Sequence, residues 1–151
     1  MKNAVLFAAA IPALLLSAAA WAADPAPAAK PAAKPKTNLI DHSNHLLIEA
    51  TAATATMGEN IPAKVWKIHP ASKYAFISQV EGGMKGSTCV VAARVMLVPL
   101  TPTAKAVLFR PQKMATAFDA LQNSSTEACK ALAKDKLKEA TLGVVSSIVK
   151  V

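Results

Sequence analysis

Two histidines beside an acidic side chain are the residues whose spacing could serve a metal ion. His42 and His45 stand three positions apart next to Asp41, so one helical turn would place both imidazoles on the same side. Copper and zinc accept such ligands, with His69 or a methionine as a distant third. The alternative is that both histidines are polar residues at an exposed helix start. No H-E-x-x-H motif or methionine cluster supports the site, so metal handling is an alternative function and no cofactor is predicted.

The two cysteines could form a disulfide. Cys89 falls in a valine-rich segment typical of a strand, and Cys129 on the apolar face of a predicted helix, so both should point inward. Bridging residues 40 apart would restrict the unfolded chain by about 4 kcal/mol in the loop-entropy model. We predict a structural disulfide; two buried thiols, or a redox pair without the usual C-x-x-C spacing, are the alternatives.

Groups for catalysis are not recognisable in the sequence. It contains neither a G-x-S-x-G elbow nor a free-cysteine motif near a histidine, and its nine carboxylates include no pair in a glycosidase context. The segment 82–86 is rich in glycine but joins two strands instead of leading into a helix, unlike a phosphate-binding loop. We therefore expect no enzyme, with an envelope enzyme of unorthodox site as a further alternative.

Composition limits the class of protein. A chain of 151 residues holds at most one compact domain, and 53% hydrophobic against 17% charged residues excludes an intrinsically disordered chain. Five glycines without a period exclude collagen, and two cysteines are too few for a knottin or a four-cysteine zinc site.

The amino terminus has the pattern of a secretory signal peptide. Lys2 precedes the uncharged run 4–20, and small residues at Ala20 and Ala22 match an A-x-A cleavage signal. We predict a signal peptide over 1–22, cleavage after Ala22, and a periplasmic or secreted protein without a transmembrane span in the mature chain. The alternative is an uncleaved anchor, although the apolar run is just shorter than a spanning helix needs.

Residues 23–37 form a predicted flexible linker in which proline, alanine and lysine alternate, and residues 38–151 form the single domain. Loss of Lys2 from the 17 basic side chains, against nine acidic ones, gives the mature chain a charge of +7. Only two of its basic residues are arginine and no stacking motif is present, which argues against nucleic acid. A lysine surface instead suits an anionic membrane, lipopolysaccharide or an acidic protein.

The pattern of apolar residues predicts an α+β domain: an antiparallel sheet of three to five strands, with an N-terminal and a C-terminal helix packed on one face. The first helix should begin near Asp41 or Ser43 and end at Gly58, with an alternating strand as the alternative. Strands are expected over 63–69, 74–80, 87–100 and 105–110, with a glycine-rich hairpin loop over 81–86. A second helix should begin at 124–127 and end near Gly143, and 144–151 is either a strand or more helix.

Two exposed features are not required by a stable core. The loop 82–86 is longer than the two residues that a tight hairpin needs, and Trp66 lies on a lysine-flanked segment. We predict that Trp66, Met84 and Lys85 contact a partner, the alternative being that Trp66 is ordinary core. The expected function is that of an exported, periplasmic, non-enzymatic module that binds an envelope protein or an anionic envelope component.

Overall fold

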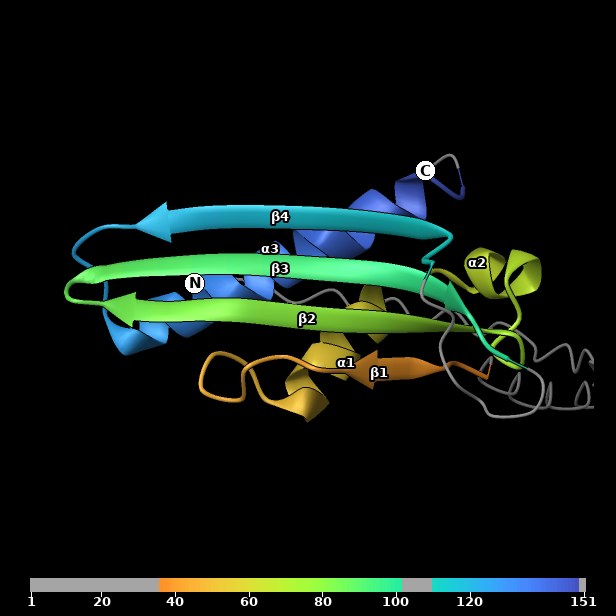
Figure 1. Cartoon of the computed structure of the whole chain (residues 1–151), viewed down its shortest axis with the longest axis horizontal. Coiled ribbons are helices and arrows are strands. Elements are labelled where there is room, and N and C mark those ends of the chain that lie inside the picture. Colours follow the sequence, from red (N-terminus) through yellow and green to blue (C-terminus); the bar gives the residue numbers. More distant parts are fainter. Residues whose placement is uncertain (1–35, 102–109, 150–151) are drawn as a thin grey trace, which may run out of the picture. The chain divides into compact units, whose positions relative to one another are not determined.

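The computed structural model describes residues 36–101 and 110–149. In chain order its elements are β1 (Leu39–Asp41), α1 (Ala50–Asn60), α2 (Ala63–Ile68), β2 (Tyr74–Lys85), β3 (Thr88–Pro99), β4 (Lys113–Leu121) and α3 (Thr126–Ser146). The predicted signal peptide, nearly all of the linker and most of the strand expected over 105–110 lie outside the described residues. Figure 1 shows one sheet with α1 and α3 behind it.

The four strands follow the order β1-β2-β3-β4. β2 and β3 pair antiparallel over their whole lengths, and β4 pairs antiparallel with β3 from Leu97↔Lys113 to Cys89↔Leu121. The short β1 runs parallel to β2. The predicted α+β class with a mainly antiparallel sheet and a helix on each side of it in sequence is confirmed.

The core lies between the sheet and the helices. On β3, Val91, Ala93, Val95 and Leu97 are buried while Ala92 and Arg94 are exposed, as expected for a sheet with one face covered. The α3 residues that meet this face recur at helical spacing: Cys129, Ala133, Leu137, Ala140 and Val144. The helix face of the sheet therefore carries the main hydrophobic core.

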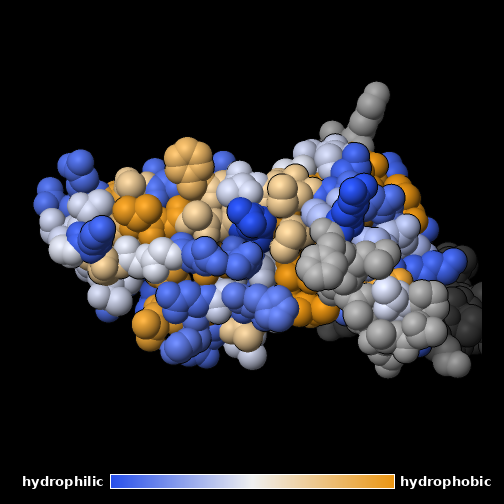
Figure 2. All heavy atoms as spheres, in the orientation of Figure 1, coloured by the Kyte–Doolittle hydropathy of each residue, from blue (hydrophilic) through white to orange (hydrophobic). Residues whose placement is uncertain are grey.

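The opposite face of the sheet is apolar in two places. Ala75, Ile77 and Val98 form a small buried cluster near one end. Over β3 and β4, in contrast, several large apolar side chains are exposed, among them Met114 and Phe118. Figure 2 shows hydrophobic atoms along the edge where Figure 1 places β4.

The helix expected from Asp41 or Ser43 to Gly58 begins later and ends later than predicted. Residues 39–41 form β1, because the backbone bonds to β2 continue through His42 N to Ser78 O at 2.9 Å. α1 then runs from 50 to 60, so Gly58 lies inside the helix. A glycine there costs about 1 kcal/mol relative to alanine, which the packing of the helix overrides.

The strand expected over 63–69 is a short helix, α2. Val65 and Trp66 are neighbours in sequence and both are buried. A strand turns neighbouring side chains to opposite faces, whereas one helical turn can direct both toward the same core. Pro62 is the N-cap residue of this helix and has the extended conformation.

The predicted hairpin is confirmed, but the loop over 81–86 is wrong. β2 continues to Lys85, and Gly86–Ser87 alone makes the turn. Gly82 and Gly83 have positive φ angles, but both remain paired with β3. Met84 and Lys85 therefore lie on the paired end of a β-hairpin and not on a free loop.

The last helix begins as predicted and ends later. Its cap is Ser125, whose hydroxyl accepts a bond from Ala128 N at 3.1 Å. Gly143 does not end it: α3 continues to Ser146, and Val149 N still donates to Val145 O. A Cβ at Gly143 would stand 2.9 Å from the Ala115 Cβ, so this glycine permits close contact between helix and sheet.

Candidate functional site

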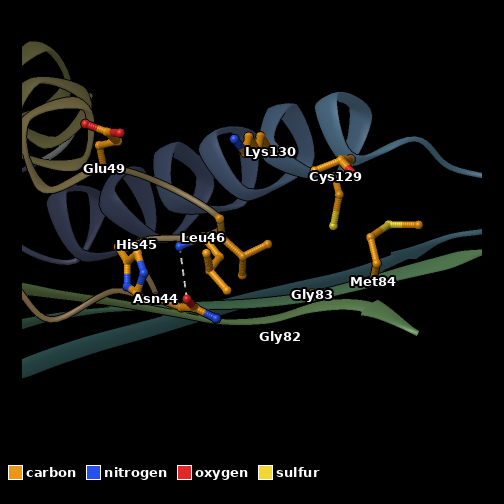
Figure 3. A pocket seen from close by; sticks show the side chains of 11 residues that line it. Asn44, His45, Leu46, Glu49, Gly82, Gly83, Met84, Cys129 and Lys130 are labelled. Carbon is orange, nitrogen blue, oxygen red and sulfur yellow. Dashed lines mark hydrogen bonds between the residues drawn. The ribbon is translucent and has the colours of Figure 1, made fainter. Parts of the chain in front are cut away.

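A groove of about 690 Å³ opens at one end of the sheet on the helix side. Three segments line it: the loop 44–49 between β1 and α1, Gly82 to Met84 of β2, and the first turn of α3 from Thr126 to Lys130. Figure 3 shows Leu46 and Met84 at its two sides, with the Cys129 side chain directed into the space between them. Two other hollows on the described residues are smaller, at about 330 and 410 Å³.

The loop that carries Leu46 is held in place by hydrogen bonds. Asn44 N donates to Val80 O at 2.8 Å, and the Asn44 side chain accepts from Leu46 N at 3.0 Å. Leu47 and Ile48 are buried and anchor the next residues, while Leu46 is 66% exposed. The fold thus presents one leucine at the groove in a fixed position.

The groove's strand side requires glycine. A Cβ at Gly82 would lie 2.0 Å from the Val90 carbonyl oxygen, and φ there is +116°. Gly83 also has a positive φ, with open space around it. Gly82 and Gly83 both line the groove, so its strand side consists there of backbone alone.

One cysteine of the disulfide, Cys129, lines the groove. Cys89 and Cys129 are bonded, with their Cα atoms 5.5 Å apart, and both are buried. This confirms the predicted pairing. Since Cys129 lies one turn into α3, the bridge fixes the start of that helix against β3.

Basic side chains lie beside the groove and along α3. Lys130 lines the groove, and Lys134 and Lys138 follow at intervals of four on the exposed side of the helix. Glu49 and His45 stand on the opposite wall. An occupant would meet an apolar centre with an exposed lysine stripe (Lys130, Lys134 and Lys138) next to it.

The residues predicted to contact a partner fall in two places. Met84 is 38% exposed and lines the groove, and Lys85 is exposed beside it. Trp66 is only 7% exposed, and its ring packs edge to face on Phe76 with centroids 5.4 Å apart. This burial favours the core interpretation of Trp66, whose indole nitrogen has no hydrogen-bond partner among the described residues.

His42 and His45 are both exposed and lie in the loop after β1, not on a helix. The Asp41 carboxylate beside them already accepts bonds from the hydroxyls of Ser43, at 2.6 Å, and Ser78, at 2.5 Å. Over residues 36–101 and 110–149, no three His, Cys, Asp or Glu side chains are grouped closely enough to hold a metal ion. The expected third ligand, His69, lies at the end of α2.

His69 gives a pH-dependent contribution to stability. Partial burial, and then repulsion from Lys113, lower its pKa in the folded protein. The unfolded chain then binds the proton more readily, so the contribution is complete above the unfolded pKa of about 6.5 and is lost as the pH falls through the folded value. We expect the urea midpoint to fall as the pH drops below about 6.5, and to fall less in His69→Gln. Equal losses in both proteins would contradict this.

Leu46 is not among the contact residues predicted from the sequence. Leu46, Leu47 and Ile48 form an apolar run that is typical of core, and no pattern singles out the first of them. Only the turn around Asn44 decides that Leu46 points outward. Met84, its companion in the groove, was predicted from a long loop, whereas the structure places it on the paired strand β2.

None of the helices within the described residues is both long and apolar enough to cross a membrane. No protein-family model matches the chain, and no curated protein matches it. Among solved structures, the PelC dodecamer from Paraburkholderia phytofirmans is similar over 73% of this chain and 87% of its own, with 13% identity and a TM-score of 0.45. A candidate lipoprotein from Caulobacter crescentus CB15 matches over 64% and 76%, with 11% identity and a TM-score of 0.30. Likeness at this level carries no function over to the present chain.

Proposed function

We propose that this protein is an exported, non-enzymatic binding module of the bacterial envelope whose groove takes an apolar segment of an acidic envelope protein. The observation that carries the proposal is the groove with Leu46 held two-thirds exposed beside it. A leucine fixed in that position contributes little to the core, and a hollow that combines apolar side chains such as Leu46 and Met84 with polar ones such as Glu49 and Lys130 is typical of binding sites.

Export is supported by the signal-peptide pattern and by the disulfide. The pattern over 1–22 predicts that the chain leaves the cytoplasm. Disulfides persist in oxidising compartments such as the periplasm, so the buried Cys89–Cys129 bridge is consistent with export to such a compartment.

An acidic partner is supported by the lysine stripe of α3. Lys134 and Lys138 are four residues apart on one exposed face, an arrangement that destabilises a helix by a few tenths of a kcal/mol. The stability of the domain does not explain such a pair. An acidic partner beside the groove would be attracted by it, mainly through a faster encounter.

The test is capture from envelope extract by the tagged chain 23–151, quantified by mass spectrometry. We expect Leu46→Asp to reduce the captured partner at least about tenfold, as for an interface residue worth more than 1 kcal/mol. Ile68→Asp is the matched control, because Ile68 is 51% exposed on α2 and does not line the groove. Equal capture by the native chain and Leu46→Asp would refute the groove as the site.

Vesicles containing phosphatidylglycerol test the anionic-component alternative. If the chain binds these vesicles in a salt-dependent way that Lys134→Glu/Lys138→Glu abolishes and Leu46→Asp leaves intact, an anionic envelope component is the ligand instead of a protein segment. If Lys134→Glu/Lys138→Glu captured as much protein as the native chain at low salt, the lysine stripe would not attract the partner.

A further inference from the structure

The free edge of β4 is a long strand that lacks two of the usual protections of an edge, a proline and a bulge, although it carries the charged residues Lys113 and Asp119. β4 is the last strand of the sheet and, among the described residues, pairs only with β3. Its nine residues pair one to one with β3, without a bulge, and contain no proline. Edges of this kind present unpaired N–H and C=O groups that can bond to another strand.

The hairpin geometry determines which groups point away from the sheet. Lys85 and Thr88 flank the two-residue turn and therefore form a hydrogen-bonded pair. Along β3 the direction of the backbone N–H and C=O groups alternates. Those of Thr88, Val90 and every second residue after them point to β2, and those of Cys89 and every second residue after it point to β4. The residues of β4 whose backbone groups face outward are consequently Met114, Thr116, Phe118 and Ala120. The Ala120 N–H is consistent with an outward orientation, because it donates to the Asp119 side chain at 2.8 Å.

The side chains next to this edge are apolar and uncovered. Phe118 is 80% exposed and Met114 56% exposed, both on the sheet face opposite the helices, and Val90 beside them on β3 is 47% exposed. An exposed aromatic and an exposed methionine at an unpaired edge are features that edge strands normally avoid.

We propose that β4 pairs antiparallel with β4 of a second copy of this chain, about a two-fold axis at Thr116. Residues 113–119 read Lys-Met-Ala-Thr-Ala-Phe-Asp, which is self-complementary about its centre. In this register Thr116 faces Thr116 of the other copy, Met114 faces Phe118, and Lys113 faces Asp119. Thr116 and the Met114–Phe118 pairs belong to the outward-facing set, so each pair exchanges two backbone hydrogen bonds.

Neighbouring two-fold registers lose this match. With the axis at Ala115, Lys113 faces Ala117 and Met114 faces Thr116. With the axis at Ala117, Lys113 faces Leu121 and Met114 faces Ala120. The Thr116 register alone among these three combines two opposite-charge pairs with two sulfur–aromatic contacts, and cross-strand pairs of both kinds are stabilising.

The charges around Asp119 favour the approach of Lys113 from the other copy. Asp119 lies 3.3 Å from Lys136 of α3, and Lys136 also bonds to Glu139 at 2.8 Å. Two carboxylates thus share one ammonium group within a copy. Lys113 from the other copy would bring the local count to two cations and two anions.

The helix layer is compatible with the pairing. α3 packs on both β3 and β4, so continuation of the sheet at a strand spacing of about 4.8 Å would place the two copies of α3 about 10 Å apart. This is close to the ordinary distance between packed helices. The groove is lined by β2 and not by β4, so it stays open in the pair and the inference is independent of the proposed function.

Charge exchange tests the register by sedimentation equilibrium of the chain 23–151. The native chain is expected to form dimers. Lys113→Glu alone and Asp119→Lys alone each place like charges opposite one another twice, and should weaken dimerisation by at least about tenfold. A mixture of these two variants restores both opposite-charge pairs and should dimerise again. A native chain that stays monomeric, or single variants that dimerise as well as the native chain, would overturn the proposal.

A cross-link tests the axis without disturbing charge. Thr116→Cys places two thiols across the two-fold axis at a Cα separation of about 5.5 Å, within the range of a disulfide. It should form covalent dimers in mild oxidant, whereas Ala120→Cys, which is also exposed but lies off the axis, should not. Equal cross-linking of both variants would show random collision and reject the register.

Discussion

Reduction of the Cys89–Cys129 disulfide is expected to lower the free energy of unfolding by about 4 kcal/mol. The bridge spans 40 residues, and in the loop-entropy model its loss frees the unfolded chain by this amount. For a domain of this size the thermal midpoint should then fall by about 15 °C. Urea unfolding with and without reductant measures the difference on one protein, without a mutation.

The control is Cys89→Ala/Cys129→Ala, which should unfold at the same low midpoint whether or not reductant is present. Both sulfurs are buried, so the double variant also loses some packing, and its stability should be at or below that of the reduced native chain. A native midpoint that reductant leaves unchanged, although both thiols titrate as free, would contradict the assigned role of the bridge.

Gly82→Ala is expected to destabilise the domain by about 4 kcal/mol. Its Cβ would stand 2.0 Å from the Val90 carbonyl oxygen, so the hairpin must move apart where β2 and β3 are paired. The positive φ adds strain of about 1 to 3 kcal/mol, and the steric displacement adds a similar amount. Urea unfolding followed by circular dichroism measures the loss.

Two other glycines of the same hairpin are matched controls. Gly83 has a positive φ but nothing within 4 Å of its Cβ position. Gly83→Ala should therefore be destabilised by the backbone strain alone, by about 1 to 3 kcal/mol. Gly86 has φ of +63°, a conformation that asparagine tolerates, so Gly86→Asn should lose less than about 1 kcal/mol. Equal losses in all three variants would show that the contact with Val90 has no special weight.

The pattern of side chains determined the elements whose burial repeats with a simple period. Alternate burial along β3 and the apolar face of α3 are legible in the sequence, because one face of each meets the core and the other meets water. The same two faces predicted that Cys89 and Cys129 meet. The α+β class followed from the order of these elements.

Tertiary contacts decided the elements that are short or placed by distant partners. β1 exists because its backbone bonds to β2, more than 30 residues away, and α2 is a helix because Val65 and Trp66 enter the same core. β4 has exposed apolar residues and no alternating pattern strong enough to predict it. Leu46 became a candidate binding residue only through the Asn44 turn, since exposure depends on where neighbouring elements pack and not on the side chain's own hydrophobicity.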